Sequence, residues 1–232
     1  MKNAGSGSLI ERLFNTGAHF AQVKSRRHPS MKPFILGAKA RVEIVDLEKT
    51  SAQLEAAKKV MTTLAKDGKT VLFVGGKAEV ATIVRDAAKR IGQPYVASRW
   101  LGGTLTNFAE IKKRIDRLAD LSQKRESGEL TKLYTKLERV KIDREIVRLS
   151  ERLDGITDIT KRPDALVIVD TKYEAHATKE AKVLGTPVIG VIGSDCNLED
   201  ATFPIVANDA SRETVTFVLG ELTAAFEEGR KA

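Results

Sequence analysis

Short apolar runs, rich in β-branched residues, alternate with helical patterns along most of the chain. The strands that this pattern predicts lie at 41–45, 70–74, 95–98, 165–169, 188–192 and 203–206. Between them, helices are predicted at 51–66, 77–91, 174–184 and 212–227. The runs LVIV and VIGVI are apolar at consecutive positions, as in strands that are covered on both faces. The alternation predicts an α/β fold, in which helices sandwich a parallel sheet of the Rossmann or flavodoxin-like kind.

Residues 107–154 break this alternation. Apolar residues recur there at steps of three and four, namely Phe108, Ile111, Ile115, Leu118, then Leu130, Leu133, Leu137, Val140, and after a phase slip Ile142, Ile146, Leu149 and Leu153. Most other residues of the segment are charged, and Ser127-Gly128-Glu129 is typical of a turn. The pattern predicts two long antiparallel helices that form a coiled-coil hairpin. The predicted domains are an α/β domain of residues 1–106 and 155–232 and an inserted hairpin of residues 107–154.

The segment RWLGGTLTNF (99–108) connects the two predicted domains and has two interpretations. It is either a glycine loop that cradles a nucleotide or a joint that fixes the angle of the hairpin. The joint is favoured because the segment combines apolar side chains that can pack on the sheet with glycines that allow backbone angles closed to other residues. These residues are Trp100, Leu101, Leu105, Gly102 and Gly103. We expect Asn107 to cap the first hairpin helix, with Glu110 as its capping-box partner.

The composition narrows the class of protein. Lys and Arg number 39 against 31 Asp and Glu, and the resulting formal net charge of +8 suits a polyanionic partner. The single cysteine, Cys196, excludes an intrachain disulfide and a cysteine-based zinc site, and it fits a reduced cytoplasmic setting. No apolar run approaches the ~20 residues that a membrane-spanning helix needs, so no membrane is expected among the partners.

None of the common catalytic motifs is complete in the sequence. The stretch VGGKAE (74–79) has Ala78 where a P-loop needs a hydroxyl, and the glycine fingerprint of dinucleotide-binding proteins is missing. His176 lies near Asp170 at a predicted strand end, which leaves a metal or general-base role open beside a simple surface position. We therefore predict no enzyme activity, no cofactor and no metal. The alternative is a small nucleotide-binding α/β enzyme or regulator that uses the strand ends near Asp170 and Gly76.

The stretch KSRRHPSMKPFILGAKAR (24–41) carries a dense set of cations. It has no helical or strand period before Val42, and its prolines and apolar residues indicate an irregular loop that is ordered against the rest of the protein. Such a loop suits contact with the phosphate backbone of RNA. The joint is expected to have an RNA-facing edge, from which Arg99 can reach a phosphate. The candidate RNA-binding residues are Lys24, Arg26, Arg27, His28, Lys32, Lys39, Arg41, Arg99 and Trp100.

Five blocks of the sequence, taken in order, resemble the bacterial small-ribosomal-subunit protein two family. They are GAHFAQVKSRRHPSMKPFILGAKARVEIVDLEKT (17–50), VLFVGGK (71–77), RWLGGTLTNF (99–108), RPDALVIVDT (162–171) and EAHATKEAKVLGTPVIGVI (174–192). The similarity extends from Leu9 to Arg230, and the predicted hairpin lies between the same two blocks as in the family. Ala21-Gln22 and residues 27–30 depart from the family's usual sequence.

The resemblance implies a structural, non-enzymatic protein of the small ribosomal subunit. Members of the family bind the 16S-type small-subunit ribosomal RNA and neighbouring small-subunit proteins, lie on the solvent side between head and body, and help to recruit small-subunit protein one. The implied fold is a parallel α/β sandwich with a protruding coiled coil. The implied location is the small ribosomal subunit in the cytoplasm.

Overall fold

The computed structural model of the chain describes residues 8–231, and its centre is a five-stranded parallel sheet. The strands are β4 (Val71–Val74), β5 (Tyr95–Val96), β6 (Ala165–Val169), β7 (Val188–Ile192) and β8 (Phe203–Val206), in the order β5-β4-β6-β7-β8. Counted from β4, this is the order 2-1-3-4-5 of flavodoxin-like folds. The predicted α/β class is therefore confirmed, and the bounds of β6, β7 and β8 agree with the sequence pattern.

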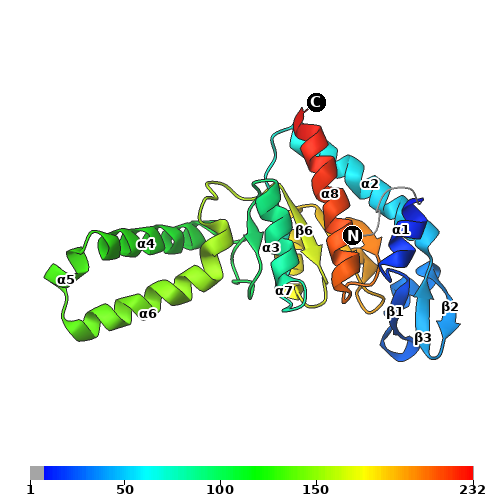
Figure 1. Ribbon diagram of the computed structural model, residues 1–232, viewed down its shortest axis with the longest axis horizontal. Helices are drawn as coiled ribbons and strands as arrows, with labels where there is room; N and C mark the ends of the chain where they lie inside the picture. The colour runs from blue at the N-terminus through cyan, green and yellow to red at the C-terminus, as the bar shows by residue number, and fades with distance from the viewer. Residues whose placement is uncertain (1–7, 232) are drawn as a thin grey trace.

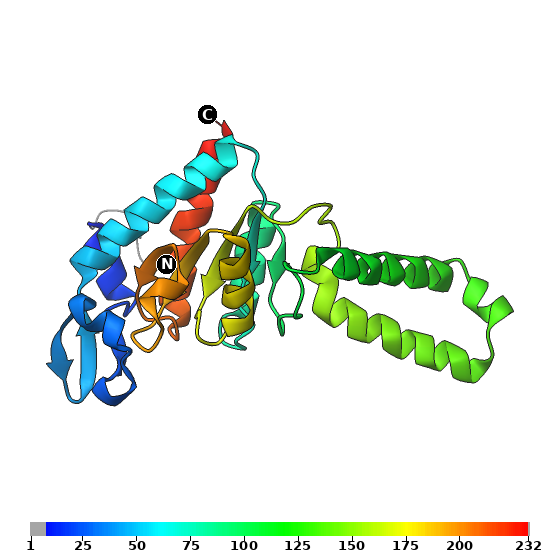
Figure 2. The same ribbon diagram turned by 180° about the vertical axis from the view of Figure 1, so that it is seen from behind.

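Helices cover both faces of this sheet (Figures 1 and 2). The helices α2 (Leu47–Lys66), α3 (Ala81–Arg90) and α8 (Arg212–Lys231) pack on one face, and α7 (Ala175–Leu184) packs on the other. Successive strand residues point to opposite faces, so Phe73 belongs to the first core and Leu72 to the second. This two-sided burial explains why the strands are apolar at consecutive positions.

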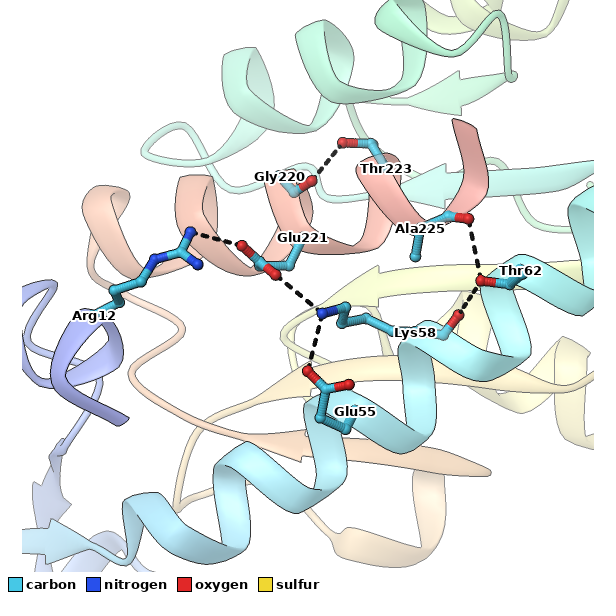
Figure 3. Close-up of polar contacts among 8 residues, drawn as sticks. All are labelled: Arg12, Glu55, Lys58, Thr62, Gly220, Glu221, Thr223 and Ala225. Carbon is cyan, nitrogen blue, oxygen red and sulfur yellow. Dashed lines mark hydrogen bonds and ion pairs between the residues drawn. The ribbon is translucent and has the colours of Figure 1, made fainter. Parts of the chain in front are cut away.

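Polar contacts join the helices α1 (Leu9–Asn15), α2 and α8 (Figure 3). Glu221 of α8 accepts from Arg12 of α1 at 2.7 Å and from Lys58 of α2 at 3.2 Å. The Thr62 hydroxyl donates to a carbonyl of α8 at 3.2 Å. A Cβ at Gly229 would lie 2.4 Å from the carbonyl oxygen of Thr62, so only glycine allows α8 to approach α2 this closely.

The protein has a second, antiparallel sheet that the sequence pattern did not predict. Its strands β1 (Phe20–Val23), β2 (Ile35–Lys39) and β3 (Val42–Val45) have the order β1-β3-β2, so the strand predicted at 41–45 does not belong to the parallel sheet. The stretch 24–41 is also not a plain loop, because it contains η1 (Lys24–Arg26), η2 (Pro29–Phe34) and all of β2.

The turn between β2 and β3 explains why the sequence pattern missed this hairpin. Ala40 and Arg41 both have left-handed backbone angles, with φ of 50° and 71°. A two-residue hairpin turn of type I′ requires left-handed angles at both central residues, and its usual sequences are Asn-Gly and Asp-Gly. In addition, β2 is exposed along most of its length, so it shows no alternation of apolar and polar residues.

Three helices separate β5 from β6 and extend away from the sheet (Figure 1). They are α4 (Phe108–Glu126), α5 (Glu129–Leu133) and α6 (Lys136–Leu153), and η3 (Asp154–Ile156) leads back to the sheet. The side chains of Ile111 and Ile115 on α4 and of Ile146 and Leu153 on α6 are buried in one apolar cluster. These positions agree with the predicted seam.

The segment after the turn departs from the prediction of one continuous second helix. Helix α5 ends at Leu133, and Thr135 begins α6 with a capping box in which Glu138 is the partner. Leu133 and Leu137 consequently are 63% and 66% exposed and do not line the seam. The phase slip between Val140 and Ile142 lies within α6 and does not coincide with this interruption.

Candidate nucleic-acid interface

A buried ionic cluster fills the carboxyl edge of the parallel sheet, where β4, β6 and β8 end. Lys77, three residues after β4, forms an ion pair with Asp170, which directly follows β6, and its ammonium lies 3.9 Å from Asp209. Asp170 has a left-handed φ of 63°, which is unusual for a residue other than glycine. The backbone N–H of Tyr173 donates to its carboxylate at 2.8 Å. The cluster occupies the point between β4 and β6 where flavodoxin-like folds bind ligands.

The two aspartates of this cluster titrate differently. Burial and the neighbouring charge of Asp170 raise the pKa of Asp209 to about 7. Burial also acts to raise the pKa of Asp170, but hydrogen bonds from Lys77 and Tyr173 outweigh it and lower the pKa. Burial and the charge of Asp170 raise the pKa of the Cys196 thiol to about 12, so this cysteine is a buried, un-ionised side chain and not a nucleophile.

Asp170, Cys196 and Asp209 are the side chains of this edge that could ligate a metal ion, since their ligand atoms lie within 4.8 Å of one another. The Lys77 ammonium already balances part of their negative charge. His176 is not part of this group and is exposed on the first turn of α7. The sequence left open a metal or general-base site formed by His176 and Asp170. The fold instead brings Asp170 together with Cys196 and Asp209.

The joint between the sheet and the helical arm is held by one carboxylate, that of Glu180 on α7. Its Oε1 accepts from the indole Nε1 of Trp100 at 3.0 Å and from the backbone N–H of Gly103 at 2.7 Å. Its Oε2 accepts from the backbone N–H groups of Leu105 and Thr106 and from the Thr106 hydroxyl, each at 3.0 Å. Trp100 and Leu105 are buried against the face of the sheet that α7 covers. The loop is thus anchored as a structural joint.

Two details of the joint differ from expectation. Gly103 has a left-handed φ of 91°, whereas a Cβ at Gly102 would meet no atom within 4 Å and its φ is not left-handed. Only Gly103 needs to be glycine. Asn107 precedes α4 but its side chain makes no capping hydrogen bond, and the carboxylate of Glu110 pairs with Lys113 at 2.6 Å. The predicted capping box is therefore absent from this helix start.

The stretch 24–41 packs on the same carboxyl edge of the sheet. The backbone N–H of His28 donates to the carbonyl of Ser194 at 2.9 Å, and the N–H of Leu198 donates to the Ser30 hydroxyl at 3.1 Å. Met31 is fully buried in a cluster with the ends of β7 and β8. The expectation that this stretch is ordered against the protein is confirmed.

The candidate RNA-binding side chains fall into two groups. The first group, Arg27, His28 and Trp100, is engaged within the protein. Arg27 forms an ion pair at 2.7 Å with Glu43, and Glu43 is only 2% exposed. The His28 ring bonds the Ser30 hydroxyl, and the Trp100 side chain is buried, with 6% exposed. The others are exposed to solvent, and they are Lys24, Arg26, Lys32, Lys39, Arg41 and Arg99. The helices that the structure describes include none long and apolar enough to cross a membrane.

Comparisons with known proteins agree with this architecture. The family model of ribosomal protein S2 matches residues 13–229. The chain belongs to the ribosomal protein S2 family. It is 39% identical over 222 residues to small ribosomal subunit protein uS2 of Coprothermobacter proteolyticus, and the aligned region covers 96% of this chain and 82% of that protein. It is 38% identical over 220 residues to uS2c of Rhodomonas salina, covering 95% and 90%, and 39% identical over 222 residues to uS2 of Dictyoglomus thermophilum, covering 96% and 90%.

Family membership confirms the resemblance read from the five sequence blocks. It also confirms the predicted class, a structural constituent of the small ribosomal subunit rather than an enzyme, and with it the location in that subunit. The alternative of a nucleotide-binding enzyme or regulator is set aside on this ground.

Sequence reasoning missed Glu180, Glu43 and Asp209. The sequence does hold a signal for Glu43. This acid stands between Val42 and Ile44 in a short apolar strand, and a carboxylate buried there requires a cation as its partner. Glu180 and Asp209 offer none, because each acquires its partners only when distant segments meet at the edge of the sheet.

Proposed function

We propose that the carboxyl edge of the parallel sheet is the surface by which this chain holds small-subunit ribosomal RNA. One observation carries the proposal: cations from separate parts of the chain are exposed along one edge. The stretch 24–41 packs on the ends of β7 and β8 through Ser194, while Arg99 follows β5 at the other end of the sheet. Exposed cations on a rigid edge suit contact with phosphates.

The proposed phosphate contacts are the exposed members of the predicted set, Lys24, Arg26, Lys32, Lys39, Arg41 and Arg99. Arg27, His28 and Trp100 are assigned to support this surface, because their polar atoms are used within the protein. Arg27 in particular neutralises the buried carboxylate of Glu43, and removing one partner of a buried ion pair is costly.

The domain division is part of the same proposal. Residues 1–106 and 155–232 form the RNA-binding α/β domain, and residues 107–154 form a coiled-coil arm, whose buried seam of Ile111, Ile115, Ile146 and Leu153 supports that description. Residues 1–7 and 232 lie outside the described part of the chain. The resemblance supplies the protein partners, which are neighbouring small-subunit proteins including small-subunit protein one.

Two adjacent arginines provide the test. Arg26→Gln removes an exposed charge, so the full-length protein should bind a small-subunit ribosomal RNA fragment more weakly, and the slope of log K against log salt should fall by about one. Its free energy of unfolding should not change. Arg27→Gln should lower the free energy of unfolding by about 2 kcal/mol, because it leaves Glu43 buried without its partner.

The control is Arg144→Gln, which removes an exposed arginine from α6. Helix α6 belongs to the arm that extends away from the sheet (Figure 1). It should leave both the salt slope and the stability at wild-type values. An unchanged slope in Arg26→Gln, or an equal loss in the control, would move the RNA contact away from this edge. Co-sedimentation of the same variants with small subunits checks the result in the assembled particle.

A further inference from the structure

A cavity of about 350 Å³ opens on the carboxyl edge between the joint and the start of α7. Its lining consists of Arg99, Trp100, Tyr173, Glu174 and His176. The volume lies at the lower end of the range of small-ligand sites, about 300–1,000 Å³. The cavity is also at the side of the sheet where open α/β folds bind their ligands.

The lining offers a flat aromatic surface beside a cation. Tyr173 is 58% exposed, although its backbone N–H is fixed on Asp170. Arg99 is exposed and forms no ion pair with the residues that the structure describes. Glu174 is buried and its Oε1 accepts the Gly76 N–H at 2.7 Å, so one of its two carboxylate oxygens is bound within the protein. An exposed ring on a fixed backbone is a preformed stacking platform.

We infer that this cavity holds one unpaired nucleotide of the bound RNA, with the base stacked on Tyr173 and a phosphate against Arg99. The inference rests on the proposed function, because the cavity lies on the same edge as the cations assigned to RNA. Stacking on an aromatic side chain requires a base that is not paired in a duplex. One stacked base with one phosphate contact gives only weak binding, so the site acts when the rest of the edge holds the strand nearby.

Tryptophan fluorescence gives a local readout. Trp100 is the only tryptophan of the chain and lines the cavity, so a base that enters should change its emission. The full-length protein is titrated with a ten-residue oligoadenylate, with a duplex RNA of ten base pairs and with 5′-AMP. The single strand should produce a saturable change. The duplex should bind without changing the emission, and 5′-AMP should show no saturation up to millimolar concentration.

Substitutions then separate stacking from charge. Tyr173→Ala should weaken binding of the oligoadenylate about 10-fold, because the stacking surface is lost. Tyr173→Phe keeps the ring and should bind as the wild type does. Arg99→Gln should also weaken binding and reduce the salt slope by about one. The matched controls Tyr134→Ala and Arg144→Gln, on the helical arm, should have no effect.

Three results would overturn the inference. The first is wild-type affinity for the oligoadenylate in Tyr173→Ala with an unchanged unfolding midpoint, and the second is an equal change of Trp100 emission with the duplex. The third is tight, saturable binding of 5′-AMP, which would assign the cavity to a free nucleotide. These results differ from failure of the proposed function. If Tyr173→Ala has no effect while Arg26→Gln still flattens the salt dependence, the RNA-binding edge stands and the nucleotide site falls. If no RNA binds, both fall.

Discussion

Replacing Glu180 by Gln should destabilise the protein although the two side chains have the same shape. The carboxylate accepts hydrogen bonds at both oxygens, two at Oε1 and three at Oε2. An amide has one oxygen and one NH₂ group. Whichever way the amide turns, its NH₂ group therefore faces N–H groups that it cannot accept from.

The magnitude follows from the donors that lose their acceptor. If the NH₂ group takes the Oε1 position, the indole N–H of Trp100 and the backbone N–H of Gly103 lose their acceptor. If it takes the Oε2 position, the backbone N–H groups of Leu105 and Thr106 lose theirs. One donor of each pair belongs to a buried residue. An unsatisfied buried donor costs about 1–3 kcal/mol, and the remaining bonds lose their charge assistance, so we expect a loss of about 3 kcal/mol.

Urea and thermal unfolding, followed by circular dichroism and by Trp100 fluorescence, measure this loss. A destabilisation of about 3 kcal/mol corresponds to a fall of roughly 6–12 °C in the unfolding midpoint of a chain of this size. Glu228→Gln, an exposed carboxylate on α8, is the control and should stay within about 0.5 kcal/mol of the wild type. If Glu180→Gln behaves like the control, the carboxylate does not anchor the joint.

The pH dependence gives a second check. Burial acts to raise the pKa of Glu180, but the hydrogen bonds from Trp100, Thr106, Gly103 and Leu105 outweigh it and lower the pKa from 4.5. A carboxyl with a depressed folded-state pKa stabilises the fold above its unfolded pKa, and this contribution is lost as the pH falls through the folded-state value. The difference between wild type and Glu180→Gln should therefore be full at pH 7 and shrink below pH 4.5.

Three further predictions concern the joint, the buried cluster and the arm. Gly103→Val should lower the free energy of unfolding in urea by about 1–3 kcal/mol, because φ there is left-handed and the new Cβ would lie 3.2 Å from Asn107 Cβ. The control Gly102→Val should change the free energy of unfolding by less than about 0.5 kcal/mol. Asp209→Asn should stabilise the protein, since burial raises the pKa of Asp209 from 3.8 to about 7 and its ionisation opposes folding; urea unfolding across pH should show the gain growing from pH 4 to pH 7. Replacing residues 111–148 by a short glycine-serine link should preserve cooperative thermal unfolding of the α/β domain, and its loss would refute the proposed domain division.

The elements of the parallel sheet could be predicted from the sequence because burial on both faces leaves a local signature. β6 and β7 are apolar at consecutive positions and are buried throughout, so their bounds follow from the sequence alone. The seam residues of α4 followed in the same way from their helical spacing. The break before Thr135 was not predicted, because a capping box and a continuing helix can share the same apolar spacing.

The site was decided by tertiary structure, because its contacts join segments far apart in the chain. Trp100 and Glu180 are 80 residues apart, and the sequence around either residue does not indicate the other as its partner. Arg26 and Arg27 illustrate the same limit at the shortest range. Both are arginines in one basic stretch, yet Arg27 reaches the buried carboxylate of Glu43 on β3, while Arg26 faces solvent. The sequence determines that the stretch is cationic, but only the packing of the antiparallel sheet determines which charge supports the fold and which is available to a partner.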